Sequence, residues 1–207
     1  MIIRRFWEAL KMEKSYLLIA CLLFLCSSLL GILFWDQVQV SLKEAGIFDR
    51  FGEITKRIEE TPTFTNVFSI IFFNNLFVSL LTIFSGILFG IFPALIIVNN
   101  GIILSAMIMR GASLSNVHPL VLFVTTVLPH GVFELPAIIT GAALGMHLGI
   151  VVIRSITSLF MKRYKEIIVE WKMIRDRFFW LLIGVIGFLF IAAIIETGLI
   201  FLIKSIQ

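Results

Sequence analysis

The chain has 207 residues, of which 59% are hydrophobic and 14% are charged, and its formal net charge is +4. A soluble domain carries about 25% charged residues, and the mean hydropathy here is +1.06, so the composition excludes an ordinary soluble domain. Residues 61–109 form a run of 49 positions without a charged side chain, whereas a membrane-spanning helix needs only about 20 residues. We therefore predict an all-α, polytopic membrane protein of about five transmembrane helices, forming a single membrane domain over residues 1–207. The small positive charge is explained by the Lys and Arg residues that favour the cytoplasmic side of a membrane. No nucleic-acid partner is expected.

The first predicted span covers residues 16–35. A basic stretch precedes it, as in a signal peptide, but the 21 residues from 15 to 35 exceed the usual apolar length of about 7–15, and no A-x-A-like site follows. We expect an uncleaved helix. Cys21 and Cys26 are five positions apart in this helix and do not share a face, so neither a disulfide nor a metal-binding pair is expected.

Two amphipathic segments indicate the orientation in the membrane. Residues 36–63 carry four basic and six acidic residues with apolar side chains at helical spacing, which predicts a short amphipathic helix. Residues 154–177 hold seven Lys or Arg against three acids and precede a last span over 178–203. Lys and Arg in short loops favour the cytoplasmic side, and four more lie in residues 1–15. We predict an inner N-terminus and inner segment 154–177, with the outer segment 36–63 and the C-terminus outside.

The middle of the chain must then cross the membrane three times, at about 66–89, 93–110 and 119–153. The last of these would be about 50 Å long as one helix, which exceeds a bilayer core of about 30 Å. We therefore expect a bend at the Pro-His-Gly sequence of residues 129–131. A sixth span, or a re-entrant or interfacial course for residues 118–129, stays open.

An internal repeat predicts a second break at residues 74–75. Residues 75–90 and 130–145 align at an offset of 55 positions. Such repeats occur in transport folds, where broken helices meet near the bilayer midplane. The four identities are Leu80 with Leu135, Ile83 with Ile138, Gly86 with Gly141, and Gly90 with Gly145. We expect broken or kinked helices near 74–75 and 129–131.

Two pairs of glycines have the small-xxx-small spacing that lets helix backbones approach closely. They either pack helices within one bundle or form the seam of a homodimer. The pairs are Gly86 with Gly90, and Gly141 with Gly145.

Six polar side chains within the predicted spans form the candidate functional cluster. Unpaired amides are costly in hydrocarbon, so each amide either pairs inside the bundle or lines a polar cavity. The His and Glu of the Pro-His-Gly-x-x-Glu run are four apart and share a helix face. Ionisable residues at membrane depth indicate a functional site by default, and the alternative is a cap at a helix start near the outer interface. The six are Asn74, Asn75, Asn99, Asn100, His130 and Glu134.

No catalytic or metal-binding constellation is recognisable in the sequence. His130 and Glu134 supply two zinc ligands, but a catalytic site needs a third. His118 is expected at the outer surface and His147 near the inner end of the fourth span, far from His130. We expect no enzymatic activity, no cofactor and no metal ion.

Arg110 and Glu196 are the remaining charged residues of the predicted spans. Both are expected near the outer ends of their helices, where an ion pair between them would lower the cost of both charges. The alternative for Arg110 is to extend its side chain to the outer interface by itself.

Five short motifs resemble the stage II sporulation protein M family of prokaryotic membrane proteins. The resemblance extends over residues 64–153, and the His-Gly-x-x-Glu form is more similar to the broad branch of the family than to its sporulation namesake. The motifs are NN at 74–75, the glycines at 86 and 90, NNG at 99–101, PHGVFELPA at 129–137 and GAALG at 141–145. This resemblance implies a multi-pass protein of the plasma membrane that anchors peptidoglycan-degrading enzymes during septal wall remodelling and engulfment, and it supplies no catalytic residues.

Two functional hypotheses follow. In the first, the protein is a scaffold whose outer segment 36–63 and inner segment 154–177 bind partners, with peptidoglycan hydrolases outside. In the second, it is a transporter, or a lipid- or ion-translocating protein, with a polar cavity around Asn75, Asn100, His130 and Glu134. Convergence of the polar groups on one cavity would favour translocation, and local pairing of each would favour the scaffold.

Overall fold

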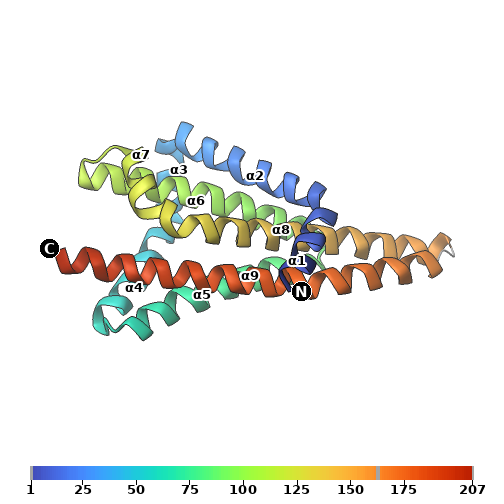
Figure 1. Ribbon diagram of the computed structural model, residues 1–207. Coiled ribbons are helices and arrows are strands. Elements are labelled where there is room, and N and C mark those ends of the chain that lie inside the picture. The colour runs from blue at the N-terminus through green and yellow to red at the C-terminus, as the bar shows by residue number, and fades with distance from the viewer. Residues whose placement is uncertain (1, 162–163, 207) are drawn as a thin grey trace.

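The computed structural model describes residues 2–161 and 164–206, which fold into helices joined by short connections (Figure 1). The elements are α1 (Ile2–Met12), α2 (Lys14–Leu33), α3 (Trp35–Glu44), α4 (Ile47–Glu60), α5 (Phe64–Ser85), α6 (Ile91–Ser115), α7 (Pro119–Leu122), a π-helical turn (Phe123–Val127), α8 (Leu128–Met161) and α9 (Tyr164–Ile206). Five helical stretches are long and apolar enough to cross a membrane, namely Lys14–Leu33, Phe64–Ser85, Ile91–Ser115, Pro119–Phe160 and Lys165–Ile203. The predicted all-α polytopic fold with five spans is confirmed.

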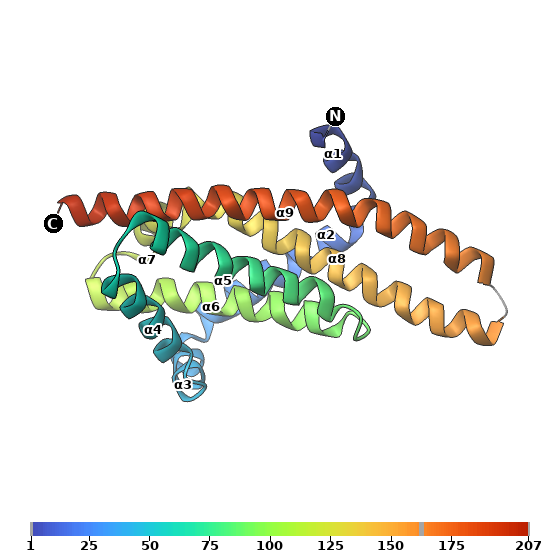
Figure 2. The ribbon, with the colours of Figure 1, turned by 90° about the horizontal axis from the view of Figure 1, so that it is seen from below.

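The connections between spans fall into two groups at opposite ends of the bundle (Figures 1 and 2). The N-terminal helix α1, the turn between α5 and α6, and the hairpin between α8 and α9 lie toward one end. Helices α3, α4 and α7 and the C-terminus lie at the other. This separation matches the division of the chain that the charge pattern predicts.

Helix α8 is the centre of the bundle. It contacts α2, α5, α6 and α9, and 67% of an apolar 18-residue window of its span, Pro119–Phe160, is buried, against 22–28% for the corresponding windows of the other four spans. One core cluster joins α8 to α2 and α6, and another joins it to α1, α5 and α9. Side chains on α8 are therefore held by protein on most sides.

Glycines allow α5 and the turn after it to lie against α8. A Cβ atom at Gly86 would overlap the backbone of Gly145, and a Cβ at Gly149 would overlap the backbone of Gly90. The turn itself reverses the chain through Phe89 and Gly90, whose φ angles of 61° and 74° are left-handed. The predicted glycine pairs thus pack against this same chain, as one of the two predicted alternatives requires.

The predicted break at residues 74–75 is wrong, because α5 is one continuous helix over Phe64–Ser85. The side chain of Thr63 accepts a hydrogen bond of 3.3 Å from the backbone N–H of Asn66 and caps its start. Asn74 and Asn75 bond to each other side by side, with 3.3 Å between Nδ2 of Asn74 and Oδ1 of Asn75. Their amides leave the backbone ladder of the helix intact.

The irregularity predicted near residues 129–131 lies slightly earlier, in the π-helical turn at Phe123–Val127 that interrupts the fourth span, and α8 begins at Leu128. The N–H of Leu128 donates to the carbonyl of Phe123, five residues back, in the π-helical turn. Pro129 has no N–H to donate to the residue four positions before it. The π-helical turn directly before the proline accommodates this missing hydrogen bond, because the backbone there already bonds over five residues instead of four.

The outer segment 36–63 forms two helices rather than one. Helix α3 ends at Glu44, and the left-handed Gly46, with a φ of 67°, redirects the chain into α4. Neither helix has a fully buried residue, and α4 reaches the bundle through Ile58, which packs against the core of α5 and α9.

The segment 154–177, predicted as one amphipathic stretch, forms the two arms of a hairpin. Its first part continues α8 and its second part begins α9, while residues 162 and 163 lie outside the described ranges. The hairpin extends past the turn between α5 and α6 (Figure 2). The last predicted span, 178–203, is likewise only part of α9, whose 43 residues correspond to about 65 Å of helix.

Candidate functional site

Three ionisable side chains meet between α8 and α9 within the membrane-spanning part of the bundle. His130 and Glu134 lie on one face of α8, with 3.7 Å between Nε2 of His130 and Oε2 of Glu134. Glu196 approaches them from α9, and one donor atom of each of the three residues lies within 4.8 Å of the others. The side chains of His130 and Glu134 are 14% and 20% exposed. Antiparallel packing of two long helices therefore joins residues 66 positions apart in sequence.

These three groups have few partners in the rest of the described chain. Neither Glu134 nor Glu196 forms an ion pair with a Lys or Arg there. The Nδ1 atom of His130 is buried and has no hydrogen-bond partner within residues 2–161 and 164–206. Burying a charge without a counter-charge is costly, so two carboxylates placed together need protons or a cation beside them.

Arg110 does not form the predicted ion pair with Glu196. Its guanidinium lies 4.0 Å from the centre of the Phe48 ring in α4, a cation–π contact that holds the arginine at the α3–α4 end. Glu196 instead lies with His130 and Glu134 on the α8–α9 interface. The position of Arg110 fits the alternative in which it lies at the interface without Glu196.

The four asparagines do not join this cluster. Asn74 and Asn99 are exposed on the surfaces of α5 and α6. Asn75 bonds to Asn74, and Nδ2 of Asn100 donates to the carbonyl of Ile96, one turn earlier in the same helix, at 3.0 Å. No hydrogen bond joins an asparagine to His130 or Glu134 in the described part of the chain. Asn74, Asn75 and Asn100 thus pair locally, and Asn99 is exposed.

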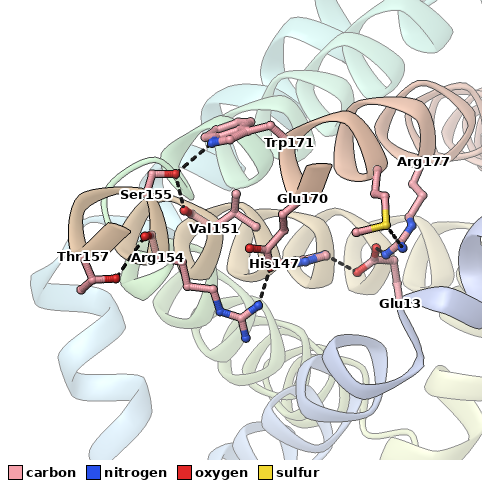
Figure 3. A network of polar contacts seen from close by, with 10 residues as sticks. Glu13, His147, Val151, Arg154, Ser155, Thr157, Glu170, Trp171 and Arg177 are labelled. Atoms are coloured by element: carbon pink, nitrogen blue, oxygen red, sulfur yellow. Dashed lines mark hydrogen bonds and ion pairs between the residues drawn. The ribbon is translucent and has the colours of Figure 1, made fainter. Parts of the chain in front are cut away.

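A second polar network lies at the opposite end of the bundle and ties the start of α2 to α8 and α9 (Figure 3). Glu13 lies between two partners: His147 Nδ1 is 2.7 Å from one carboxylate oxygen, and Arg177 Nη1 is 3.1 Å from the other. The Glu13 side chain is only 1% exposed. The Tyr16 ring stacks on His147 with 4.5 Å between ring centres. This network is closed, since both carboxylate oxygens are satisfied.

Two contacts hold the arms of the hairpin together (Figure 3). Arg154 on α8 pairs with Glu170 on α9. Nε1 of Trp171 donates to Oγ of Ser155 at 2.8 Å. Many apolar side chains remain on the outer surfaces of the arms, including Ile156, Phe160, Ile168, Val169 and Met173.

Glu13, Arg177 and the partnership of Glu196 with His130 and Glu134 are not among the residues and pairs that the sequence predicts. One signal was present for the inner network, because His147 lies within an apolar run, where an ionisable residue indicates a functional or structural site. Glu13 is one of two acids, with Glu8, in the basic segment that precedes the first apolar stretch. Which helices bring these residues together depends on tertiary packing, which no local spacing encodes.

Comparison with sequence families matches the chain to the model described as stage II sporulation protein M, over residues 20–199. Comparison with curated proteins and with solved structures gave no match.

Proposed function

Since the chain belongs to the stage II sporulation protein M family, we propose that it is a scaffold of the prokaryotic plasma membrane that holds partner proteins on both faces of the bilayer. Family membership and the five apolar helices make it a multi-pass, sporulation-associated membrane protein. The proposed outer partners are peptidoglycan hydrolases, which the scaffold would position for remodelling of the cell wall.

The observation that carries this proposal is the pair of amphipathic elements at opposite ends of the bundle. Helices α3 and α4 have no fully buried residue, and Phe51 on α4 is 37% exposed. At the other end, Phe160 on the hairpin is 85% exposed. Apolar side chains in such places are typical of surfaces that contact another protein or a membrane. Elements of this kind on both sides suit a protein that connects two compartments.

The arrangement of the polar groups supports a scaffold over translocation. A pathway through the bilayer requires polar groups that converge on a common cavity. Here the amides of α5 and α6 pair within their own helices or are exposed. Of the two helices that the repeat predicts to be broken, α5 is continuous, and the fourth span is interrupted only by the π-helical turn at Phe123–Val127.

The proposal is tested by replacing Ile47–Glu60, the whole of α4, with a flexible Gly/Ser linker of equal length. We expect the variant to insert into the membrane but to lose the peptidoglycan-hydrolase activity that co-purifies with the unchanged protein, measured by zymography. Phe160→Ser, at the other end of the bundle, is the control and should retain that activity. Equal recovery of hydrolase activity with the linker variant would refute an outer scaffold built on α4.

A further inference from the structure

We propose that His130, Glu134 and Glu196 bind a divalent transition-metal ion between α8 and α9, with Zn²⁺ as the best fit. This site is independent of the partner-binding elements and goes beyond the scaffold role. It also departs from the sequence-based expectation of no metal, because Glu196 supplies the third ligand that His130 and Glu134 lack.

The distances suit ligands that share one ion. The 3.7 Å between Nε2 of His130 and Oε2 of Glu134 is too long for a hydrogen bond. Two donors that each lie about 2.0–2.2 Å from a shared Zn²⁺ are at most roughly 4.4 Å apart. All three donor atoms lie within 4.8 Å of one another. Small side-chain rotations would therefore bring all three within coordination distance of one ion.

The electrostatics also call for a cation. Glu134 and Glu196 have no Lys or Arg partner in the described chain, and both are partly buried among membrane-spanning helices. Two neighbouring carboxylates repel each other, and transfer from water disfavours their charged forms. A divalent ion neutralises both, as metal coordination does for buried acids elsewhere.

The imidazole of His130 provides a separate observation. Its Nδ1 atom is buried without a partner in residues 2–161 and 164–206, and Nε2 lies beyond hydrogen-bond distance of Glu134. Neutral imidazole has one lone pair available to a metal. The π-helical turn ends at Val127, directly before this stretch, and such turns occur frequently at functional sites.

The donor set selects the class of ion. One imidazole nitrogen and two carboxylate oxygens suit Zn²⁺, Mn²⁺ or Fe²⁺, whereas Ca²⁺ and Mg²⁺ prefer oxygen ligands throughout. Affinity for Zn²⁺ exceeds that for Mn²⁺ or Fe²⁺ at a given site. Three protein ligands leave a fourth position for water or another small ligand.

The test uses the full chain, purified in detergent with a tag that contains neither His nor Cys, stripped with a chelator and then titrated with Zn²⁺. Elemental analysis should find about one ion per chain, as a three-ligand site implies. Loss of one ligand in Glu134→Gln or Glu196→Gln should weaken affinity at least about 100-fold, because even the loss of a group that only hydrogen-bonds to a metal ligand costs about 10–100-fold. Matched controls are Glu60→Gln and His118→Asn, which change the same residue types outside the cluster and should bind as the unchanged protein does.

Co²⁺ provides a readout that reports the ligands directly. The Co²⁺ form of the unchanged protein should show visible d–d bands that are absent in Glu196→Gln and altered in Glu196→Asp, which keeps the charge but shortens the side chain. Each variant is compared as a monodisperse sample. Failure of the unchanged protein to retain Zn²⁺ overturns the proposal whatever the variants do, and so does equal affinity in Glu196→Gln. Retention that is lost only in the two control variants would assign the ion to another site and overturn it as well.

Discussion

Gly149 and Gly90 show how little space separates α8 from the turn between α5 and α6. A Cβ on Gly149 would overlap the backbone nitrogen and Cα of Gly90. No side-chain rotation can relieve a clash with backbone, so the two elements would have to separate. These single residues therefore determine how closely α5 and α6 pack on the central helix.

Gly149→Ala is expected to lower the free energy of unfolding by about 1–3 kcal/mol, the usual cost of overpacking. SDS titration of the purified protein, followed by circular dichroism, measures the change. Gly187→Ala is the matched control, because nothing lies within 4 Å of a Cβ built at that helical glycine, and its stability should not fall. Equal stability of the two variants would show that α8 does not lie against this turn.

At the same scale, the sequence could identify unusual residues but not their partners. His130 and Glu134 were predictable as neighbours because four positions on a helix place them on one face. The sequence offers Arg110 as a partner for Glu196, since both are charged and both are expected near outer helix ends, and the alternative is that Arg110 extends to the interface by itself. In the structure, the Arg110 guanidinium instead lies over the Phe48 ring. This contact depends on the position of α4 relative to the bundle, which the sequence does not reveal.

Among the elements, the junction of α1 and α2 depends most on a single residue. Glu13 separates the two helices in sequence and connects them to α8 through His147 and to α9 through Arg177. Because Glu13 is buried, its loss leaves the Arg177 charge without its partner. The network therefore fixes the direction in which α1 leaves the bundle.

Glu13→Gln is expected to destabilise the protein by about 3–5 kcal/mol, the cost of breaking a buried ion pair by removing one partner. Limited proteolysis should cut α1 faster in this variant, and the same SDS titration gives the stability. The control is Glu8→Gln, whose partner Arg4 lies 2.8 Å away in an exposed pair and whose stability should match the unchanged protein. Unaltered proteolysis of Glu13→Gln would contradict a structural role for the network.

Element boundaries illustrate what hydropathy can and cannot predict. The five spans were predictable because each contains a long apolar window. The exact course of residues 119–161 was not predictable, since a Pro-His-Gly sequence normally suggests a bend at the proline itself. Here the π-helical turn before Pro129 accommodates the absence of the hydrogen bond that proline cannot donate. Whether a proline breaks a helix depends on the hydrogen bonds of the preceding turn, which are a property of the fold.

For the whole molecule, the orientation in the membrane follows from charge and from the two groups of connections. Residues 154–177 hold seven Lys or Arg, and residues 1–15 hold four; α1 and the hairpin lie toward the same end. From the positive-inside rule we expect that end to lie in the cytoplasm. The α3–α4 helices and the C-terminus are then expected outside.

This orientation predicts which positions react with a membrane-impermeant maleimide in intact cells. In a background in which Cys21 and Cys26 are replaced by Ser, Glu53→Cys on α4 should be labelled without permeabilisation. Lys172→Cys, on the hairpin, should be labelled only after permeabilisation. Both positions are exposed in the structure, so a difference between them reports sidedness. The reverse labelling pattern would invert the orientation.

The uninterrupted course of α9 has a mechanical consequence. A helix of 43 residues is stiff along its axis, and this one runs beside α8 from the hairpin to the C-terminal end. A partner that binds the hairpin and tilts it would also tilt the stiff helix α9 against α8. This tilt would displace Glu196 relative to His130. Binding of a partner at the hairpin would thereby change the affinity of the proposed site for its ion. Helix α9 would in this way transmit a signal across the bilayer.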